Sequence, residues 1–191
     1  MEAISGLHYY EEALPESLLT ELEQCYSDTN PDWVALTDAE HSRQVIHYGS
    51  VYQYKSKHNQ QRQADPFTPL LERVLEVVYT KHPALRGRLN QGIVNRYLPG
   101  QGIAKHIDDI KLYDDGICCF TIGSGATMIF RKKQDNLVVP VHVDRGSVYV
   151  MSGDSRYLWT HELPARKTDL VDGVRVERGT RISLTFRILR K

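Results

Sequence analysis

The sequence contains few cysteines, and none are spaced for a metal or redox site. Its 191 residues include three cysteines, Cys25 and the adjacent pair Cys118 and Cys119. An odd number without CxxC spacing argues against a disulfide framework and against a thiolate zinc site. We therefore expect all three to be small buried side chains.

The sequence also lacks an excess of charge and a long apolar run. Lys and Arg together number 24, as do Asp and Glu, so the formal net charge is zero. Bulk charge therefore does not indicate a nucleic-acid binder, and any such surface would be local. No stretch approaches the length of a membrane span, and the N-terminus lacks a signal pattern. These absences predict a soluble intracellular protein, cytoplasmic or nuclear, with no membrane association and no evident obligate protein partner.

Repeats, low-complexity tracts and linkers are absent as well, which predicts a single domain over residues 1–191. Within it, residues 1–90 should supply two helices and residues 91–191 the β-rich core. A short strand is expected over Ile4–Tyr10. Apolar residues at helical spacing predict one helix opening at Leu14-Pro15-Glu16 and a second starting at Pro66 and ending at Lys81-His82-Pro83.

The second half of the chain has short β-type runs separated by turns. The predicted strands are Ile93–Leu98, Ile103–Asp108, Ile117–Ile122, Ala126–Arg131, Leu137–Val143, Ser147–Met151, Tyr157–His161 and Thr180–Ile188. Short strands at this spacing are typical of an antiparallel sandwich or barrel, and eight strands suit a jelly roll. The predicted fold is mainly β (α+β), a double-stranded β-helix braced on one outer face by the two N-terminal helices.

A His-x-Asp motif follows a Pro-Gly turn in this β-rich half. On a strand, His106 and Asp108 would share one face. With a second, distant histidine they can form the two-histidine, one-carboxylate site of a non-haem Fe(II) oxygenase. His161, at the end of a late strand, is the strongest candidate for that third ligand. The alternative is that His106 and His161 are ordinary core or surface histidines.

The C-terminal strand carries polar residues on one face. Arg181, Ser183, Thr185 and Arg187 alternate with apolar residues. This pattern fits a solvated edge strand and the wall of a wet cavity equally well. In a cavity, arginine forks would bind the carboxylates of a dicarboxylic acid. Asn95 and Tyr97 share one face of their own strand and offer further hydrogen-bonding groups.

Taken together and in order, these motifs resemble the signature of AlkB-type Fe(II)/2-oxoglutarate dioxygenases, from about Val45 to the chain end. The resemblance implies that His106, Asp108 and His161 bind Fe(II), and that O₂ is the oxidant. It also implies a 2-oxoglutarate site in which Arg181 holds the distal carboxylate and Arg187 lies near the metal-proximal end. Its remaining members are Asn95, Tyr97 and Ser183.

Two further segments are most similar to the branch of this family that contains the tRNA wobble-uridine hydroxylase. They are Arg43-x-Val45-x-His47-Tyr48-Gly49-x-x-Tyr52-x-Tyr54 and Ser152–His161. Two positions depart from the family pattern. Ser183 stands where several relatives have Asn, and Glu162 stands where Gly is usual, adding bulk and negative charge beside the expected metal.

The resemblance also suggests a nucleotide-binding lid. Aromatic rings stack on unpaired bases and cations meet phosphates, which makes the lid candidates Tyr48, Tyr52, Tyr54, Lys55, Lys57, His58 and Arg62. Alternating tyrosines also suit an ordinary strand. Arg156 is a further candidate substrate contact. In contrast, Asp109, Asp114 and Asp115 form an acidic patch that should repel phosphates along its edge.

The implied reaction converts 2-oxoglutarate and O₂ to succinate and CO₂ while a substrate C–H is oxidised. On an N-methyl group of DNA or RNA this would be repair by demethylation, and on a tRNA uridine side chain it would be hydroxylation. The base would be single-stranded or flipped out of a duplex. Two alternatives remain open: a dioxygenase of the same fold acting on protein or lipid, and a non-catalytic jelly-roll binding module.

Overall fold

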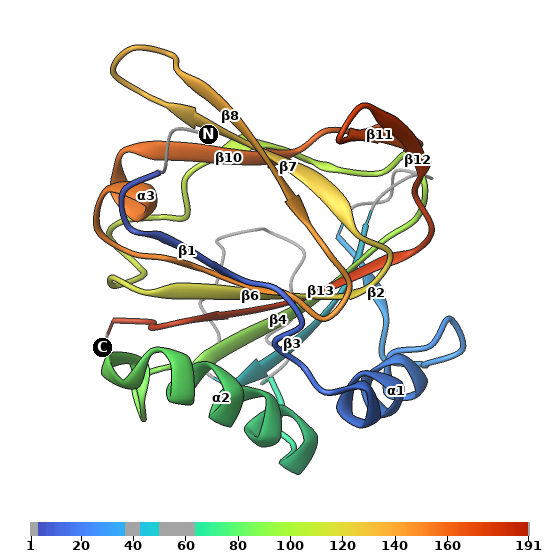
Figure 1. The fold of residues 1–191 in the computed structure, drawn as a ribbon. Helices are drawn as coiled ribbons and strands as arrows, with labels where there is room; N and C mark the ends of the chain where they lie inside the picture. The colour runs from blue at the N-terminus through green and yellow to red at the C-terminus, as the bar shows by residue number, and fades with distance from the viewer. Residues whose placement is uncertain (1–3, 37–42, 50–63, 191) are drawn as a thin grey trace.

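The computed structural model describes residues 4–36, 43–49 and 64–190. Two antiparallel sheets face each other, and two helices cover the outer face of the larger sheet (Figure 1). The larger sheet has the order β1-β9-β6-β13-β4-β3-β2, the smaller one β5-β10-β7-β8, and β11-β12 form a separate hairpin. This arrangement is the double-stranded β-helix, or jelly roll, that the sequence predicts.

The strands are short throughout. Their bounds are β1 Leu7–Tyr10, β2 Val34–Ala35, β3 Gln44–Gly49, β4 Gln91–Tyr97, β5 Ile103–His106, β6 Ile117–Gly123, β7 Ala126–Lys132, β8 Val138–Val143, β9 Val148–Met151, β10 Trp159–Leu163, β11 Thr168–Val171, β12 Val174–Glu177 and β13 Arg181–Arg187. The helices are α1 Glu16–Cys25, α2 Pro69–Lys81, α3 Gly153–Tyr157 and the 3-10 turn η1 Pro83–Leu85.

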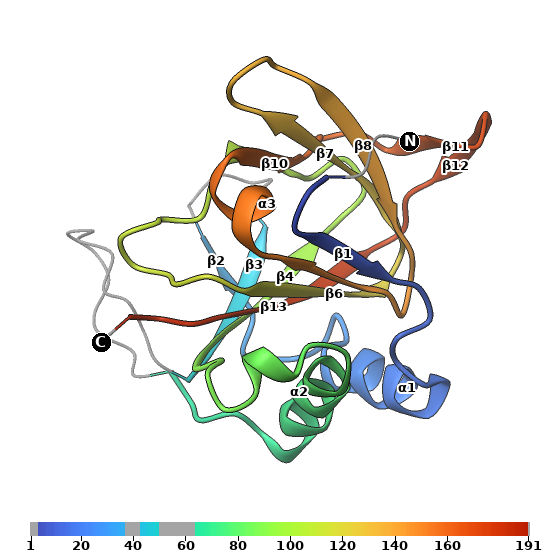
Figure 2. The ribbon, with the colours of Figure 1, turned by 60° about the vertical axis from the view of Figure 1, so that its left-hand side comes forward.

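The larger sheet separates two hydrophobic cores. On its outer face, apolar stripes of α1 and α2 pack on side chains such as Phe120, Leu184 and Phe186. On its inner face, Ile117, Tyr149 and Met151 meet residues of the smaller sheet. Figure 2 shows the two helices below the large sheet and the smaller sheet above it. The helices therefore stiffen one wall of the space between the sheets, as predicted.

The second helix begins three residues later than predicted. The Thr68 side chain accepts a hydrogen bond from the Leu71 amide, and Pro69 takes the first helical position. A hydroxyl N-cap followed by proline satisfies orphan amides at a helix start. Pro66 therefore precedes the helix instead of starting it.

Two features escape the strand pattern. The strand predicted over Tyr157–His161 begins two residues later, at Trp159, because Tyr157 is the last residue of the short helix α3, which starts at a capping box of Ser152 and Ser155. The hairpin β11-β12 adds a pair of strands that the sequence did not predict.

The cysteine prediction is also partly wrong: all three thiols are free, as expected, but Cys25 is exposed while Cys118 and Cys119 are buried.

Strand registers bring the predicted site residues together. β13 lies between β4 and β6, so that Ser183 is opposite Asn95 on one side and Thr121 on the other. In the smaller sheet, His161 of β10 is the direct partner of His106 of β5. None of the described helices is long and apolar enough to cross a membrane.

Candidate active site

A cavity of about 450 Å³ lies between the two sheets. Its wall carries the predicted metal ligands and polar residues of the larger sheet, among them Asn95, His106, Asp108, His161, Arg181 and Arg187. The polar faces of β4 and β13 thus line a cavity. The solvated edge strand, which the sequence left open, is not what the structure contains.

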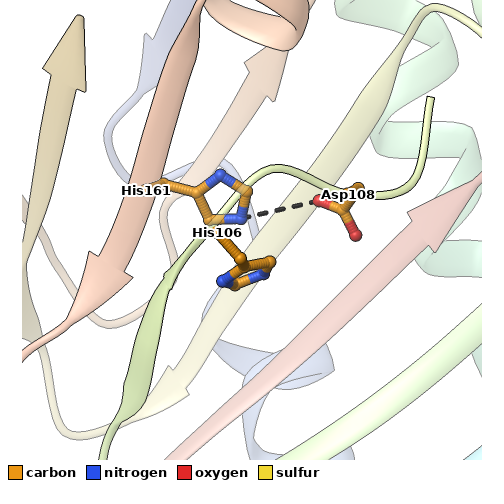
Figure 3. A group of neighbouring side chains, drawn as sticks. All are labelled: His106, Asp108 and His161. Atoms are coloured by element: carbon orange, nitrogen blue, oxygen red, sulfur yellow. Dashed lines mark ion pairs between the residues drawn. The ribbon is translucent and has the colours of Figure 1, made fainter. Parts of the chain in front are cut away.

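Two imidazoles and one carboxylate converge at the smaller sheet. One ligand atom from each of His106, Asp108 and His161 lies within 4.8 Å of the others. Figure 3 shows His161 directed at Asp108, and the distance from His161 Nε2 to Asp108 Oδ2 is 3.5 Å. The two histidine rings are 4.4 Å apart between centroids. A set of this composition is typical of a non-haem Fe(II) centre.

The secondary structure of the motif differs from the prediction at one point. β5 ends at His106, so Asp108 lies in the connection after the strand and not on it. The alternation argument therefore holds for His106, which faces His161 across the ladder, and fails for Asp108. The carboxylate reaches the same place from a non-strand backbone.

The protonation states suit metal ligation. The Nδ1 atom of His106 lies 2.7 Å from the carbonyl oxygen of Ala104. Because a carbonyl only accepts, Nδ1 is the donor in this contact, and Nε2 is the nitrogen that could bind a metal. Burial lowers the pKa of His161 to about 4 against the opposing charge of Asp108, so this imidazole is neutral at pH 7.

The carboxylate of Asp108 is ionised. Burial by itself would raise its pKa, but the nearby Arg187, His161 and His106 outweigh burial and lower it to about 2. Arg187 Nε donates to Asp108 Oδ1 over 2.7 Å, whereas Oδ2 faces His161. One carboxylate oxygen is therefore held by arginine, and the other is directed at the histidines.

A buried arginine lies on the opposite wall. Arg181 is 4% exposed, donates to Thr121 Oγ1 over 3.1 Å, and has an Nε without a hydrogen-bond partner in the described part of the chain. Its guanidinium lies 5.7 Å from the ring centre of Tyr97. No carboxylate within the described ranges pairs with it. An ionised group so placed is suited to an anionic ligand.

The neighbours of Arg181 provide hydrogen-bonding groups on the same wall. Asn95 Nδ2 donates to Ser183 Oγ over 3.4 Å, and Asn95 Oδ1 accepts from Arg43 Nε over 3.2 Å. Burial raises the pKa of Tyr97 despite the nearby Arg43 and Arg181, so its phenol stays protonated. These groups complete a polar wall around the Arg181 guanidinium.

Comparison with known proteins identifies this arrangement. The model of the 2OG-Fe(II) oxygenase superfamily matches residues 14–187. The chain belongs to this superfamily. It is similar to the tRNA (carboxymethyluridine(34)-5-O)-methyltransferase ALKBH8 of Macaca fascicularis, with 33% identity over 94% of this chain and 31% of that protein. The Xenopus tropicalis protein of the same name is 33% identical over 83% of this chain and 28% of its own length.

Solved structures agree on the fold. OsALKBH1 matches with a TM-score of 0.68 and 15% identity over 98% of this chain and 100% of that one. A Pseudomonas putida prolyl-4-hydroxylase matches with a TM-score of 0.63 and 16% identity over 97% and 93%. Together with the superfamily match and the ALKBH8 relatives, this makes the chain an AlkB-like Fe(II)/2-oxoglutarate-dependent oxygenase. It spans less than a third of the ALKBH8 proteins of Macaca and Xenopus.

Two predicted substrate contacts of this AlkB-like oxygenase are wrong. Tyr48 is 8% exposed and belongs to the core beneath the larger sheet, among the residues that face the helices. Arg156 is 2% exposed, and within the described ranges its hydrogen bonds go to backbone carbonyls. Neither side chain is available to a nucleotide. The other lid candidates, which lie between Tyr52 and Arg62, fall outside the described residues.

Two expectations about charge also change. Asp114 pairs with Arg88 and Arg190, so the predicted acidic patch is partly neutralised. Glu162 follows the inward-facing His161 on β10, and alternation directs its side chain to the outer face of the sheet. Its charge therefore lies away from the cavity.

Several residues at the site were not singled out as site residues from the sequence. Thr121, which accepts a hydrogen bond from Arg181, lies in an otherwise apolar strand, where alternation with the cavity-lining Cys119 would have indicated its direction. Arg43, His47 and Gln91 line the cavity itself. The first two belong to the motif Arg43–Tyr54, but the pattern alone did not show which of its residues face inward.

Proposed function

We propose that this chain uses Fe(II), 2-oxoglutarate and O₂ to oxidise a modified nucleic-acid base, with an RNA base as the preferred substrate. The observation that carries the proposal is the single cavity containing both the His106, Asp108 and His161 cluster and the buried Arg181. The cluster suits the metal, and the arginine suits a dicarboxylate.

The three clustered side chains would hold the iron. His106 presents Nε2 because Nδ1 is bonded to a backbone carbonyl, and His161 is neutral because it is buried. Asp108 contributes one oxygen while Arg187 retains the other. Two imidazoles and one carboxylate would leave further coordination positions for a bidentate acid and O₂.

Arg181 would bind the distal carboxylate of 2-oxoglutarate through its guanidinium fork. Tyr97, Asn95 and Ser183 adjoin that position on β4 and β13, and Thr121 adjoins it on β6. Arg187, which the resemblance places near the metal-proximal end of the cosubstrate, donates to Asp108 Oδ1 and to Gln91 Oε1. We assign it to orientation of the metal ligand.

Bound iron supplies the redox chemistry, which couples conversion of 2-oxoglutarate and O₂ to succinate and CO₂ with transfer of one oxygen atom to a substrate C–H. The protein orients the cosubstrate and the substrate and excludes bulk water. If the oxidised carbon is an N-methyl group, formaldehyde is released. If it is a stable side-chain carbon, the product remains hydroxylated.

The substrate would enter from the end of the cavity distant from Arg181. Arg181 and Arg187 are six residue steps apart along β13, about 20 Å at strand spacing. His47 and Gln91 line the cavity on strands β3 and β4 near the Arg187 end. β3 leads into the segment that holds the predicted lid. A single-stranded or flipped base fits such an entrance.

The relatives' names support a nucleic-acid substrate. The ALKBH8 proteins of Macaca and Xenopus are named for a tRNA carboxymethyluridine activity, and an Arabidopsis thaliana homologue, 26% identical over 82% of this chain, for alkylated DNA repair. We therefore favour a modified tRNA uridine, with N-methylated DNA or RNA as the second nucleobase candidate.

A substrate panel tests this proposal. The protein would be incubated with Fe(II) and 2-oxoglutarate against wobble-uridine-modified tRNA stem-loops, N-methylated RNA and DNA oligonucleotides, and peptides. Mass spectrometry would detect a gain of about 16 Da or loss of a methyl group. We expect oxidation of an RNA base, abolished in His106→Ala and retained in the control His142→Ala. Oxidation of peptides alone would overturn the nucleobase assignment.

The predicted lid has its own test within the same panel. Tyr52→Ala should weaken RNA oxidation about tenfold, because stacking on one base contributes about 1–3 kcal/mol. Lys57→Ala should also weaken it, because a cation that meets a phosphate is lost. Their succinate formation without RNA should match the wild type. Unchanged RNA oxidation in both variants would contradict a lid built from these residues.

A further inference from the structure

Arg156 is a buried charged side chain outside the cavity wall. It is 2% exposed, and its Nε has no hydrogen-bond partner within the described ranges. Nη1 donates to the carbonyl of Asp108 over 2.9 Å, and Nη2 donates to the carbonyls of Tyr113 over 3.0 Å and Asp109 over 3.3 Å. A buried guanidinium requires such acceptors to offset its lost hydration.

All three carbonyls belong to the connection between β5 and β6. β5 ends at His106 and β6 begins at Ile117, so no sheet ladder holds the backbone of Asp108. Within the connection, the Asp109 carboxylate accepts from the amides of Lys111 and Leu112, which shapes a local turn. The contacts of Arg156 join this turn to α3, while backbone hydrogen bonds of Leu112 and Asp114 join the later part of the connection to the C-terminal residues.

The other end of the Arg156 side chain is firmly placed. It projects from α3, whose start is fixed by the Ser152 and Ser155 capping box and by a hydrogen bond from the Ser155 amide to the Ser5 carbonyl. α3 is followed directly by β10, and His161 lies on β10 in register with β5 and β7. Arg156 therefore connects the segment before His161 to the backbone of Asp108.

We propose that Arg156 is a positioning residue that fixes the Asp108 carboxylate relative to His161 and thereby sets the affinity of the metal site. His106 and His161 are placed by their strand ladder, whereas Asp108 depends on a connection whose carbonyls converge on one guanidinium. Without Arg156, Asp108 would still face Arg187, but the connection would lose three hydrogen bonds, one of them at the Asp108 carbonyl. This inference rests on the proposed metal site.

Only arginine among the side chains carries enough donors, in a fixed planar fork, to reach three carbonyls at once. Lysine at this position would keep the charge and reach fewer acceptors from a single nitrogen. Methionine would keep much of the volume and lose every donor. The two substitutions therefore separate the hydrogen bonds from the packing.

Binding of Mn(II) to the whole chain tests the proposal without any turnover. Free Mn(II) would be counted by electron paramagnetic resonance for the wild type, Arg156→Met and Arg156→Lys. Loss of a group that orients a metal ligand typically weakens metal affinity about 10–100-fold. We expect a loss of at least tenfold for Arg156→Met and a smaller loss for Arg156→Lys.

Arg178 provides the matched control for removing a buried arginine. It is 8% exposed and pairs with Asp169 and the Pro164 carbonyl, away from the connection that carries Asp108. Arg178→Met should lower the unfolding temperature but leave the Mn(II) dissociation constant within twofold of the wild type. Equal weakening in Arg178→Met and Arg156→Met would show a general loss of structure and overturn the positioning role.

The remaining outcomes are equally decisive. A folded Arg156→Met protein that binds Mn(II) within twofold of the wild type would contradict the proposal. If Arg156→Met does not fold, Arg156→Lys decides, and an unchanged affinity there would overturn it. Failure of the wild type itself to bind Mn(II), when His161→Ala behaves identically, would instead remove the proposed metal site.

Discussion

Replacing Arg181 by methionine should separate cosubstrate binding from stability. In the free protein this guanidinium is buried and has one described hydrogen bond, to Thr121. Removing a buried charge that lacks a carboxylate partner stabilises the fold by about 1–3 kcal/mol. Loss of the hydrogen bond offsets about 1 kcal/mol of that gain. The free energy of unfolding should therefore stay equal or rise by up to about 2 kcal/mol.

The affinity of Arg181→Met for 2-oxoglutarate, in contrast, should fall strongly. Two charge-assisted hydrogen bonds to the distal carboxylate contribute about 1.5–3 kcal/mol each, so their loss weakens binding at least about 100-fold. Arg181→Lys, which keeps the charge without the fork, should lose about tenfold.

Calorimetric titration with 2-oxoglutarate in the presence of Mn(II), combined with urea unfolding of the free protein, measures both quantities. Thr121→Val serves as the control, because it removes the described partner of Arg181 but keeps the guanidinium, and it should bind 2-oxoglutarate within about fivefold of the wild type. An Arg181→Met protein that is destabilised by 3 kcal/mol and binds 2-oxoglutarate normally would refute this reasoning.

Two further predictions concern the metal ligands in the free protein. The pKa of His161 is lowered to about 4 in the folded protein, so as the pH falls this imidazole takes up a proton in the unfolded chain before it does so in the folded one. The contribution of His161 to the free energy of unfolding should therefore be fully present above about pH 6.5 and fall by about 3 kcal/mol as the pH drops to 4. Urea unfolding at several pH values measures it. This loss should be absent in His161→Gln. The same loss of stability at low pH in that variant would contradict the assignment to His161. Arg187→Met breaks the pair with the buried Asp108 carboxylate and should lower the free energy of unfolding at pH 7 by about 3 kcal/mol. The exposed Arg145→Met control should lose much less, and equal losses would remove the special role of Arg187.

The sequence predicted the site better than it predicted the surroundings of the site. Strict alternation in β13 placed Arg181 and Ser183 on one face, and the structure confirms that this face lines the cavity. Alternation could not tell which face of β3 is inward, so Tyr48 was predicted at the nucleotide and lies in the helix-facing core. The direction depends on sheet packing, which the local pattern does not contain.

Charge was the other source of error. Arg156 stands close in sequence to His161 and was predicted to meet substrate. Its actual acceptors are carbonyls more than forty residues away, at Asp108 and Tyr113. The connection that carries Asp108 has no periodic pattern. Its dependence on a distant side chain therefore could not be predicted from either segment alone.

The most direct test of the central claim is the ratio of succinate formed to nucleobase oxidised, measured with Fe(II), O₂ and modified RNA. We predict one succinate for each oxidised base in the wild type. His161→Ala should form neither product, because it removes one of the three clustered ligands. Fe(II)-dependent oxidation that persists in His161→Ala, or wild-type oxidation without succinate, would contradict the account.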